Sequence, residues 1–335
     1  MKTSWGTDAS VIAVPTRRGR RPPERRAPRL ALGILWAGFV VAAIILLDFV
    51  DLTLYGLVVP GVAIALAVVS TRARTLRMPG LRWVRLGPDR GDLLAIGVLF
   101  AAVVALFKLA FGVFTDSTLG LFLSFGAGLV LGVVGPIVYT VWARGRPLSS
   151  LGLGLHRWRS TVALAVLLGT VQFSITLWGY DMPPPVDWVP LLVMSLVVGL
   201  FEAVFFRGFV QGALERSFGT GSAVLGAAAL YAVYHVGYGM GGSEMVFLFG
   251  LGVVYAVAYR ITENVLVLWP LLTPLGAFFN NLEAGDLAGQ LPWASIAGFA
   301  DVLGLMVAAI WLGHRREKRP GARRGMGAAA LQRGS

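Results

Sequence analysis

The sequence contains no cysteine and little charge, and each shortage excludes a class of protein. Without cysteine there is no disulfide framework, no thiolate nucleophile and no cysteine-ligated metal. Only 14% of the residues are charged, whereas soluble domains carry about 25%. Hydrophobic residues make up 56% of the chain, so most of it must face lipid or other buried helices. These proportions predict an integral membrane protein.

Histidine and lysine are also scarce. The only histidines are His156, His235 and His314, so we do not expect a three-histidine metal site. No cofactor is expected, and the ligand set for a metal ion is incomplete. Only Lys2, Lys108 and Lys318 are lysines among 29 basic residues. This bias towards arginine, with abundant Ala, Gly and Val, is typical of a GC-rich bacterial genome and favours a bacterial cytoplasmic (inner) membrane.

The net charge of +12 lies in the tails and in the loops between apolar stretches. A basic rim of this kind is typical of a membrane protein whose loops meet anionic lipid headgroups. We therefore expect lipid, and no nucleic acid, as a partner of these charges.

The apolar stretches predict an all-α, polytopic bundle of about ten transmembrane helices. A span needs about 20 mostly apolar residues to cross the hydrocarbon core. The candidate spans are residues 30–47, 52–70, 92–114, 118–142, 160–180, 189–213, 220–237, 244–260, 264–280 and 292–313.

The loop charges predict that both termini lie in the cytoplasm. With the arginine-rich N-terminal tail inside, every basic residue except Lys108 falls on the inner side of the membrane. Acidic residues prevail in the predicted outer loops, as the positive-inside rule expects. Lys108 lies towards the outside, where its long side chain could reach the interface.

The chain divides into five predicted regions. Residues 1–29 form a basic, proline-broken tail that we expect to be disordered. Residues 30–180 hold five spans that carry no chemical signal. Residues 181–290 hold the candidate functional residues, residues 291–313 form a final span, and residues 314–335 form a second basic tail.

Glu202 is a charged residue in an apolar span, in the run VVGLFEAVFFRGF. Charge at this depth costs about 2.5–3.5 kcal/mol on insertion scales and needs a reason. Gly199 and Ala203 flank it, so a partner or substrate could approach closely. The plainer alternative is a structural glutamate bonded to a neighbouring span. Arg207 lies about 140° further round an α-helix, so we expect it to mark the inner membrane boundary or to hold a neighbouring loop.

His235 ends the apolar run AAALYAVYH, and Tyr231 lies one helical turn before it. A lone histidine on an apolar helix is more often a core residue than a ligand. The presence of Glu202 one span earlier, and of two asparagines two spans later, favours a functional role.

Asn280 and Asn281 end the span VLVLWPLLTPLGAFFNN. Counting back by helical turns from Asn280 gives a strip of small residues formed by Gly276, Ala277 and Thr273. The strip is either a packing groove between helices or a cleft for a substrate backbone, with Asn280 offering an amide donor.

Asp301 lies in the last span and has no evident partner, so a polar contact between helices is the default interpretation. A transporter, in which Glu202, His235 and Asp301 form a proton or ion relay, is one alternative function.

The order of these residues resembles the CAAX-protease and bacteriocin-processing (CPBP) family of intramembrane endopeptidases. That family carries Glu-Glu-x-x-x-Arg, Phe-x-x-x-His and His-x-x-x-Asn on successive spans. The resemblance implies that Glu202 activates the attacking water, that His235 helps to hold or activate it, and that Asn280 stabilises the oxyanion. Arg207 matches the motif arginine and Tyr231 the aromatic residue.

Two positions depart from the family pattern. Ala203 replaces the second glutamate, and Gly276 replaces the histidine of the third motif; moving the register to Asn281 puts Ala277 there instead. Losing one oxyanion donor typically costs about 10²–10³-fold in rate. Because catalytic zinc usually has three protein ligands, Glu202 and His235 alone favour a metal-free mechanism.

The leading expectation is an endopeptidase that cleaves a membrane-associated peptide or protein segment. The alternative from the same resemblance is a pseudo-protease that binds or scaffolds a segment in the old cleft. The protease requires Glu202, His235 and Asn280 to converge on one cavity. At about 1.5 Å per residue, however, His235 and Asn280 fall towards the outer half of the membrane and Glu202 nearer the middle.

Overall fold

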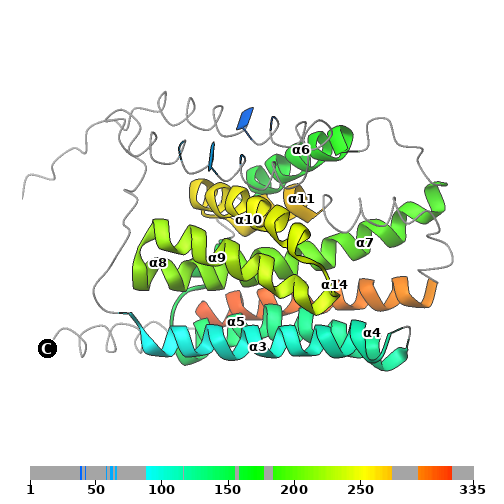
Figure 1. Cartoon of the computed structure of the whole chain (residues 1–335), viewed down its shortest axis with the longest axis horizontal. Helices are drawn as coiled ribbons and strands as arrows, with labels where there is room; N and C mark the ends of the chain where they lie inside the picture. The colour runs from blue at the N-terminus through cyan, green and yellow to red at the C-terminus, as the bar shows by residue number, and fades with distance from the viewer. Residues whose placement is uncertain are drawn as a thin grey trace, which may run out of the picture.

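A computed structural model describes residues 88–115, 117–154, 158–176, 184–273 and 293–318, with a few isolated positions between 38 and 65. The described residues form helices and no strand. Figure 1 shows that the longest of these helices run roughly along one direction, while some of the others are inclined to it.

The helices follow one another along the chain with short connections. The first half holds α3 (Arg90–Gly112), α4 (Thr118–Phe125), the π-helix η2 (Gly126–Val134), α5 (Gly135–Val138), the π-helix η3 (Tyr139–Ala143), the 3-10 turn η4 (Leu148–Leu151) and α6 (Trp158–Thr176). The second half holds α7 (Pro185–Glu202), the π-helix η5 (Ala203–Gln211), α8 (Gly212–Phe218), α9 (Thr220–Tyr234), the 3-10 turn η6 (His235–Tyr238), α10 (Gly242–Thr262), α11 (Val265–Thr273) and α14 (Trp293–Glu317).

Local sequence sets where several helices begin and turn. Asp89 caps α3 by accepting hydrogen bonds from the amides of Gly91 and Asp92 at 3.0 and 3.2 Å, and Ser117 caps α4 in the same way. Such side chains replace the partners that the first helical amides lack. Gly219, with φ of 87°, makes the sharp turn from α8 into α9.

Five described helices are long and apolar enough to cross a membrane, and the protein is an all-helical, multi-pass membrane bundle. Predicted spans 30–47 and 52–70 lie almost wholly outside the described residues, and 264–280 is described only as far as Thr273. The count of ten spans and the cytoplasmic termini therefore remain predictions. The five candidate spans are Arg90–Gly112, Thr118–Ala143, Trp188–Phe218, Gly242–Thr262 and Ile296–Glu317.

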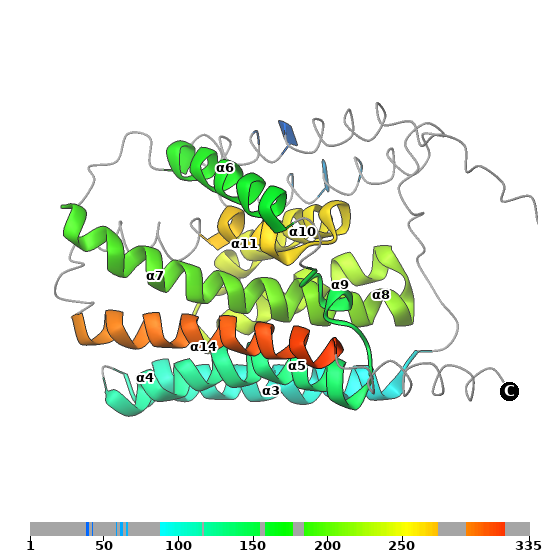
Figure 2. The same cartoon turned by 180° about the vertical axis from the view of Figure 1, so that it is seen from behind.

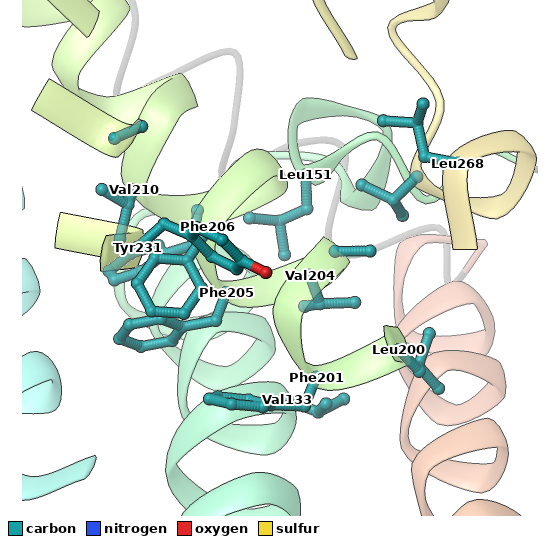
Figure 3. Packing of buried hydrophobic residues seen from close by; sticks show 14 of the residues in the cluster. Val133, Leu151, Leu200, Phe201, Val204, Phe205, Phe206, Val210, Tyr231 and Leu268 are labelled. Atoms are coloured by element: carbon teal, nitrogen blue, oxygen red, sulfur yellow. The ribbon is translucent and has the colours of Figure 1, made fainter. Parts of the chain in front are cut away.

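The rod formed by α7, η5 and α8 lies at the centre of the bundle. It contacts α9, α11, α14 and η2, and all nine residues of η5 are buried. Figure 2 shows α14 beside α7, with α3, α4 and α5 beyond it. Aromatic side chains of α7 and η5 fill the interior. Phe205 and Phe206 of η5 pack near Tyr231, while Phe201 of α7 lies beside Val133 (Figure 3).

A buried carboxylate ties several helices together at the basic end of the bundle. Asp92 of α3 is fully buried. It accepts hydrogen bonds from Tyr139 at 2.9 Å, Arg144 at 3.0 Å, Arg146 at 2.8 Å and Arg216 at 3.1 Å. The loop after Arg146 continues the connection, because the amide of Leu148 donates to Glu317 of α14. Neighbouring helices are thus fixed in height relative to one another at this end.

Candidate active site

Glu202 stands at the junction where α7 becomes the π-helix η5. In a π-helix each amide bonds the carbonyl five residues earlier, so residues five apart lie nearly above one another. Glu202 and Arg207 therefore both reach Tyr231: its hydroxyl bonds Glu202, and the guanidinium lies over its ring. The expected separation of about 140° was wrong because it assumed an α-helix.

Two tyrosines of α9 bind both oxygens of the Glu202 carboxylate. The hydroxyl of Tyr231 donates to Oε2 at 3.3 Å, and the hydroxyl of Tyr234 donates to Oε1. Glu202 is half-buried, with Ala203 and Phe201 buried on either side of it. The carboxylate is therefore held in one orientation at the contact between α7 and α9.

His235 is the first residue of η6, directly after α9 ends, and only 7% of it is exposed. Its Nδ1 lies 2.8 Å from the carbonyl oxygen of Tyr231. Because a carbonyl only accepts, Nδ1 must carry the hydrogen, which leaves the Nε2 lone pair free in the neutral ring. The ring centroid lies 4.0 Å from that of Tyr234. His235 and Glu202 thus share the same two tyrosines, and the expected difference in depth does not separate them.

Arg207 is buried inside the span Trp188–Phe218, with 2% of the residue exposed. Its guanidinium carbon lies 4.9 Å from the ring centroid of Tyr231 and 5.8 Å from that of Tyr255. Its Nη1 and Nη2 have no hydrogen-bond partner among the described residues. The expectation that Arg207 marks the membrane boundary or holds a loop was wrong; it is an interior cation between α9 and α10.

Gly208, next to Arg207, is explained by a close approach of the chain. A Cβ at this position would lie 2.3 Å from the carbonyl oxygen of Leu151 in η4, which is closer than atoms can pack. The backbone of η5 and the turn η4 can therefore meet only at glycine. Leu151 and Val204 are seen near this crossing in Figure 3.

Several residues around the site were not predicted from the sequence. Tyr234, which binds Glu202, and Tyr238, whose ring centroid lies 5.6 Å from that of His235, were missed. A signal was present, since Tyr231, Tyr234 and Tyr238 follow the i, i+3, i+7 spacing of one helix face. Phe107 of α3 packs on Phe201, Tyr234 and Tyr238, so a span with no assigned role also builds the site.

The third predicted motif lies almost wholly outside the described part of the chain. Asn280, Asn281, Gly276 and Ala277 lie outside the described residues, and Thr273 is described only as the end of α11. Gly199 is buried within α7.

Two further predicted elements stand apart from this cluster. Among the residues with described positions, no three His, Asp or Glu side chains gather in a way that could hold a metal ion, and the metal-free mechanism remains a prediction. Asp301 is exposed on α14 and does not join Glu202 and His235.

Comparison with known proteins points to one family. A family model described as type II CAAX prenyl endopeptidase Rce1-like matches residues 183–271. No curated protein and no solved structure matches the chain. The matched residues include Glu202, Arg207, Tyr231 and His235 and end before Gly276 and Asn280. Residues 183–271 of this membrane protein are therefore an Rce1-like region, as the order of the motifs predicted.

Proposed function

We propose that the chain is an intramembrane endopeptidase that hydrolyses a peptide bond of a membrane-associated peptide or protein segment. Glu202 is the base for the attacking water, and His235 positions that water. The proposal rests on one observation: a half-buried carboxylate of α7 is bonded to Tyr231 and Tyr234, beside the ring of His235.

Glu202 has the properties required of a positioned base. Its two oxygens are oriented by hydroxyl donors that belong to a different helix, so the carboxylate does not need to be organised during the reaction. A carboxylate has about four acceptor sites, and the two tyrosines use two of them. The remaining lone pairs are available to accept a proton from water.

His235 has the properties required of a partner for the water. With Nδ1–H bonded to the carbonyl of Tyr231, the free Nε2 can accept a hydrogen bond from the same water that Glu202 activates. A neutral imidazole held by its own helix adds orientation and brings no charge into the apolar interior.

The reaction then needs few steps. Glu202 takes a proton from water as the oxygen bonds to the scissile carbonyl carbon, which gives a tetrahedral oxyanion. The carbon–nitrogen bond breaks as the protonated Glu202 returns its proton to the leaving amine. In this proposal Asn280 donates its side-chain amide to the oxyanion.

Replacing Glu202 with Gln tests the proposal directly. We expect cleavage of a membrane-tethered reporter peptide library to fall by about 10²–10⁴-fold, the range that general-base catalysis contributes, with unchanged membrane insertion. Glu244→Gln is the matched control, because Glu244 is exposed and its carboxylate only caps α10. Equal cleavage by the wild type and by Glu202→Gln would rule the mechanism out.

A binding or scaffolding pseudo-protease is the second candidate. It is favoured by Ala203, which is 2% exposed where the CPBP pattern has a second glutamate. On this alternative, neither the wild type nor Glu202→Gln cleaves any reporter, and both support the same cellular phenotype. Comparing cleavage and phenotype in the wild type and in Glu202→Gln therefore distinguishes the protease from the pseudo-protease.

We propose the bacterial cytoplasmic membrane as the location. The support is the basic, arginine-rich composition of the tails and loops and the set of apolar helices. The substrate class follows from this location, because only a segment within or at the membrane can reach Glu202.

A further inference from the structure

A polar stripe runs along one face of the central rod, from the candidate base towards the basic end of the bundle. Its members are Glu202, Arg207, Gln211 and Glu215, which follow one another at steps of five, four and four residues. Such steps return to nearly the same side of a π-helix and of an α-helix, so the four side chains lie one above another. Helices α9 and α10 both contact η5, and α9 also contacts α8 (Figure 1).

The two middle members of the polar stripe are buried, but their hydrogen-bonding groups are not all used. Arg207 is 2% exposed and Gln211 0%. Nη1 and Nη2 of Arg207 and Oε1 of Gln211 have no hydrogen-bond partner among the described residues. Leaving buried donors and acceptors unpaired is costly, and in proteins such groups commonly bond ordered water. The unpaired atoms therefore point to water within the polar stripe.

Contacts continue from Arg207 to the candidate base. The guanidinium carbon lies 4.9 Å from the ring centroid of Tyr231, and the hydroxyl of Tyr231 donates to Oε2 of Glu202 at 3.3 Å. Tyr255 of α10 lies beside both residues: its ring centroid is 5.8 Å from the guanidinium carbon and 6.1 Å from the centroid of Tyr231. A water bound to Arg207 therefore lies next to the groups that hold Glu202.

Polar contacts also continue from Gln211 to the surface at the basic end. Nε2 of Gln211 donates to the carbonyl oxygen of Ala256 at 2.8 Å, and the Gln211 side chain lies beside the Glu215 carboxylate. Oε1 of Glu215 lies 3.5 Å from Nε of Arg260, which also pairs with Glu263. The exposed fraction of the side chain is 22% at Glu215 and 67% at Glu263. The polar stripe thus joins an exposed ion pair to the candidate base.

The polar stripe differs from the purely structural polar contact elsewhere in the bundle. Both oxygens of the buried Asp92 are bonded to described side chains, including those of Tyr139 and Arg146. Arg207 and Gln211 are as deeply buried, yet each keeps unused donors or acceptors that face the same line of polar groups. A contact that only joined helices would have no need of these unused groups.

We propose that the polar stripe binds a single file of water molecules that supplies Glu202 from the basic end. This inference rests on the proposed function, because hydrolysis consumes one water for each bond in a site enclosed by apolar helices. Gln211 and Arg207 bind the buried waters, while Glu215 and Arg260 admit them. The fixed charge of Arg207 repels a hydrated proton, so the path supplies neutral water.

X-ray radiolytic labelling tests for this water directly. The pulse makes hydroxyl radicals from water, and a buried side chain is oxidised where bound water lies next to it. Tyr255 and Phe205 are 4% and 0% exposed, and Phe205 packs among other phenylalanine rings. In the wild type in liposomes we expect Tyr255 to be labelled at least about tenfold faster than Phe205, because only Tyr255 borders the buried waters.

Gln211→Leu tests whether the polar stripe holds the water. The Ala256 carbonyl keeps its hydrogen bond within α10, so the bundle should tolerate this change. We expect the labelling of Tyr255 to fall to the rate of Phe205. We also expect kcat for a membrane-tethered reporter peptide to fall by about tenfold, which corresponds to one lost hydrogen bond to water. Gln211→Asn keeps an amide and leaves room for water, so it should retain both readouts.

Labelling does not require cleavage, so the path and the proposed function can fail separately. Glu202→Gln should lose cleavage and keep the labelling of Tyr255. Labelled Tyr255 in a wild type that cleaves no reporter would support the path and contradict the peptidase. Two results overturn the path: wild-type Tyr255 labelled as slowly as Phe205, and Gln211→Leu in which Tyr255 is labelled as in the wild type, whatever its cleavage.

Discussion

Arg207 keeps a positive charge in the interior by resting it on aromatic rings. Its guanidinium lies within 6 Å of the centroids of Tyr231 and Tyr255, where the negative face of each ring attracts a cation. Glu202 is attracted to the same cation. Arg207 is therefore the local counter-charge to Glu202, and its side chain also packs between α9 and α10.

Replacing Arg207 with Met removes this counter-charge at similar volume. We expect the free energy of unfolding to fall by about 1–3 kcal/mol, because Glu202 loses its cation in an apolar setting. The loss should shrink in the Glu202→Gln background, because the two residues are coupled. Thermal unfolding in detergent measures both values, with exposed Arg159→Ala as the neutral control. An equal loss in both backgrounds would show that packing alone matters.

Among the elements, η5 does the most to build the site. Its wide turns bring Arg207 beneath the same tyrosine that binds Glu202, and its one glycine, Gly208, lets η4 cross against its backbone. The contact of Arg207 with Tyr231 depends on the π-helical geometry, and the contact of Gly208 with Leu151 depends on the missing side chain. The sequence FFRGF is therefore needed for the packing of η5 as well as for the candidate site.

Gly208→Ala is expected to destabilise the protein. The new Cβ would meet the Leu151 carbonyl oxygen at 2.3 Å, and backbone on both sides can yield little, so we expect a loss of about 1–3 kcal/mol or more. Gly126→Ala, at the start of η2, is the matched control because a Cβ there meets nothing within 4 Å; it should be neutral or slightly stabilising. Comparable melting temperatures for the two variants would contradict the close approach.

At the scale of the whole molecule, Asp92 connects the helices at the end of the bundle where Arg144, Arg146 and Arg216 lie. One buried carboxylate accepts hydrogen bonds from three arginines and Tyr139, and these partners come from α8, η3 and the loop between η3 and η4. The ends of helices that are distant in the chain are thus held at one point.

Asp92→Asn should loosen this junction. Three guanidinium groups would keep their positive charges without the buried carboxylate, so we expect a loss of about 3 kcal/mol. Asp89→Asn is the comparison, because the Asp89 side chain is 32% exposed and such pairs contribute less than about 1 kcal/mol. Guanidinium-chloride or thermal unfolding in detergent measures the loss of stability in each variant. A larger loss in Asp89→Asn than in Asp92→Asn would show that Asp89, and not Asp92, holds these helix ends together.

The smaller contribution of Asp89 should depend on pH. Partial burial tends to raise the pKa of Asp89, but hydrogen bonds from Arg144 and from the amide of Asp92 outweigh burial and lower the pKa below its ordinary value of 3.8. A lowered pKa stabilises the fold above the ordinary value, and this stabilisation is lost as pH falls through the lowered one. The melting temperatures of the wild type and Asp89→Asn should therefore converge below that pH.

Hydropathy and charge were enough to predict the helical membrane class and the five candidate spans of the described residues. They also marked Glu202 and His235 as polar residues in apolar helices, and the structure places these two residues beside the same tyrosines. They could not predict η5, because hydropathy does not record which carbonyl each amide bonds, and Arg207 was misplaced for that reason. They also left Asp92 unremarked at the edge of a predicted span, since a carboxylate near an interface is expected to be solvated until its arginine partners are known. Asn280 lies outside the described residues and stays a prediction.

The wide turns of η5 also set the angle between the two ends of the central rod. Glu202, before η5, faces the tyrosines of α9, while Arg216, after it, reaches Asp92 at 3.1 Å. A uniformly wound α-helix of the same residues would advance further per residue, so Arg216 would swing away whenever Glu202 kept its direction. The number of residues per turn in η5 therefore determines the angle about the helix axis between the side chains of Glu202 and Arg216.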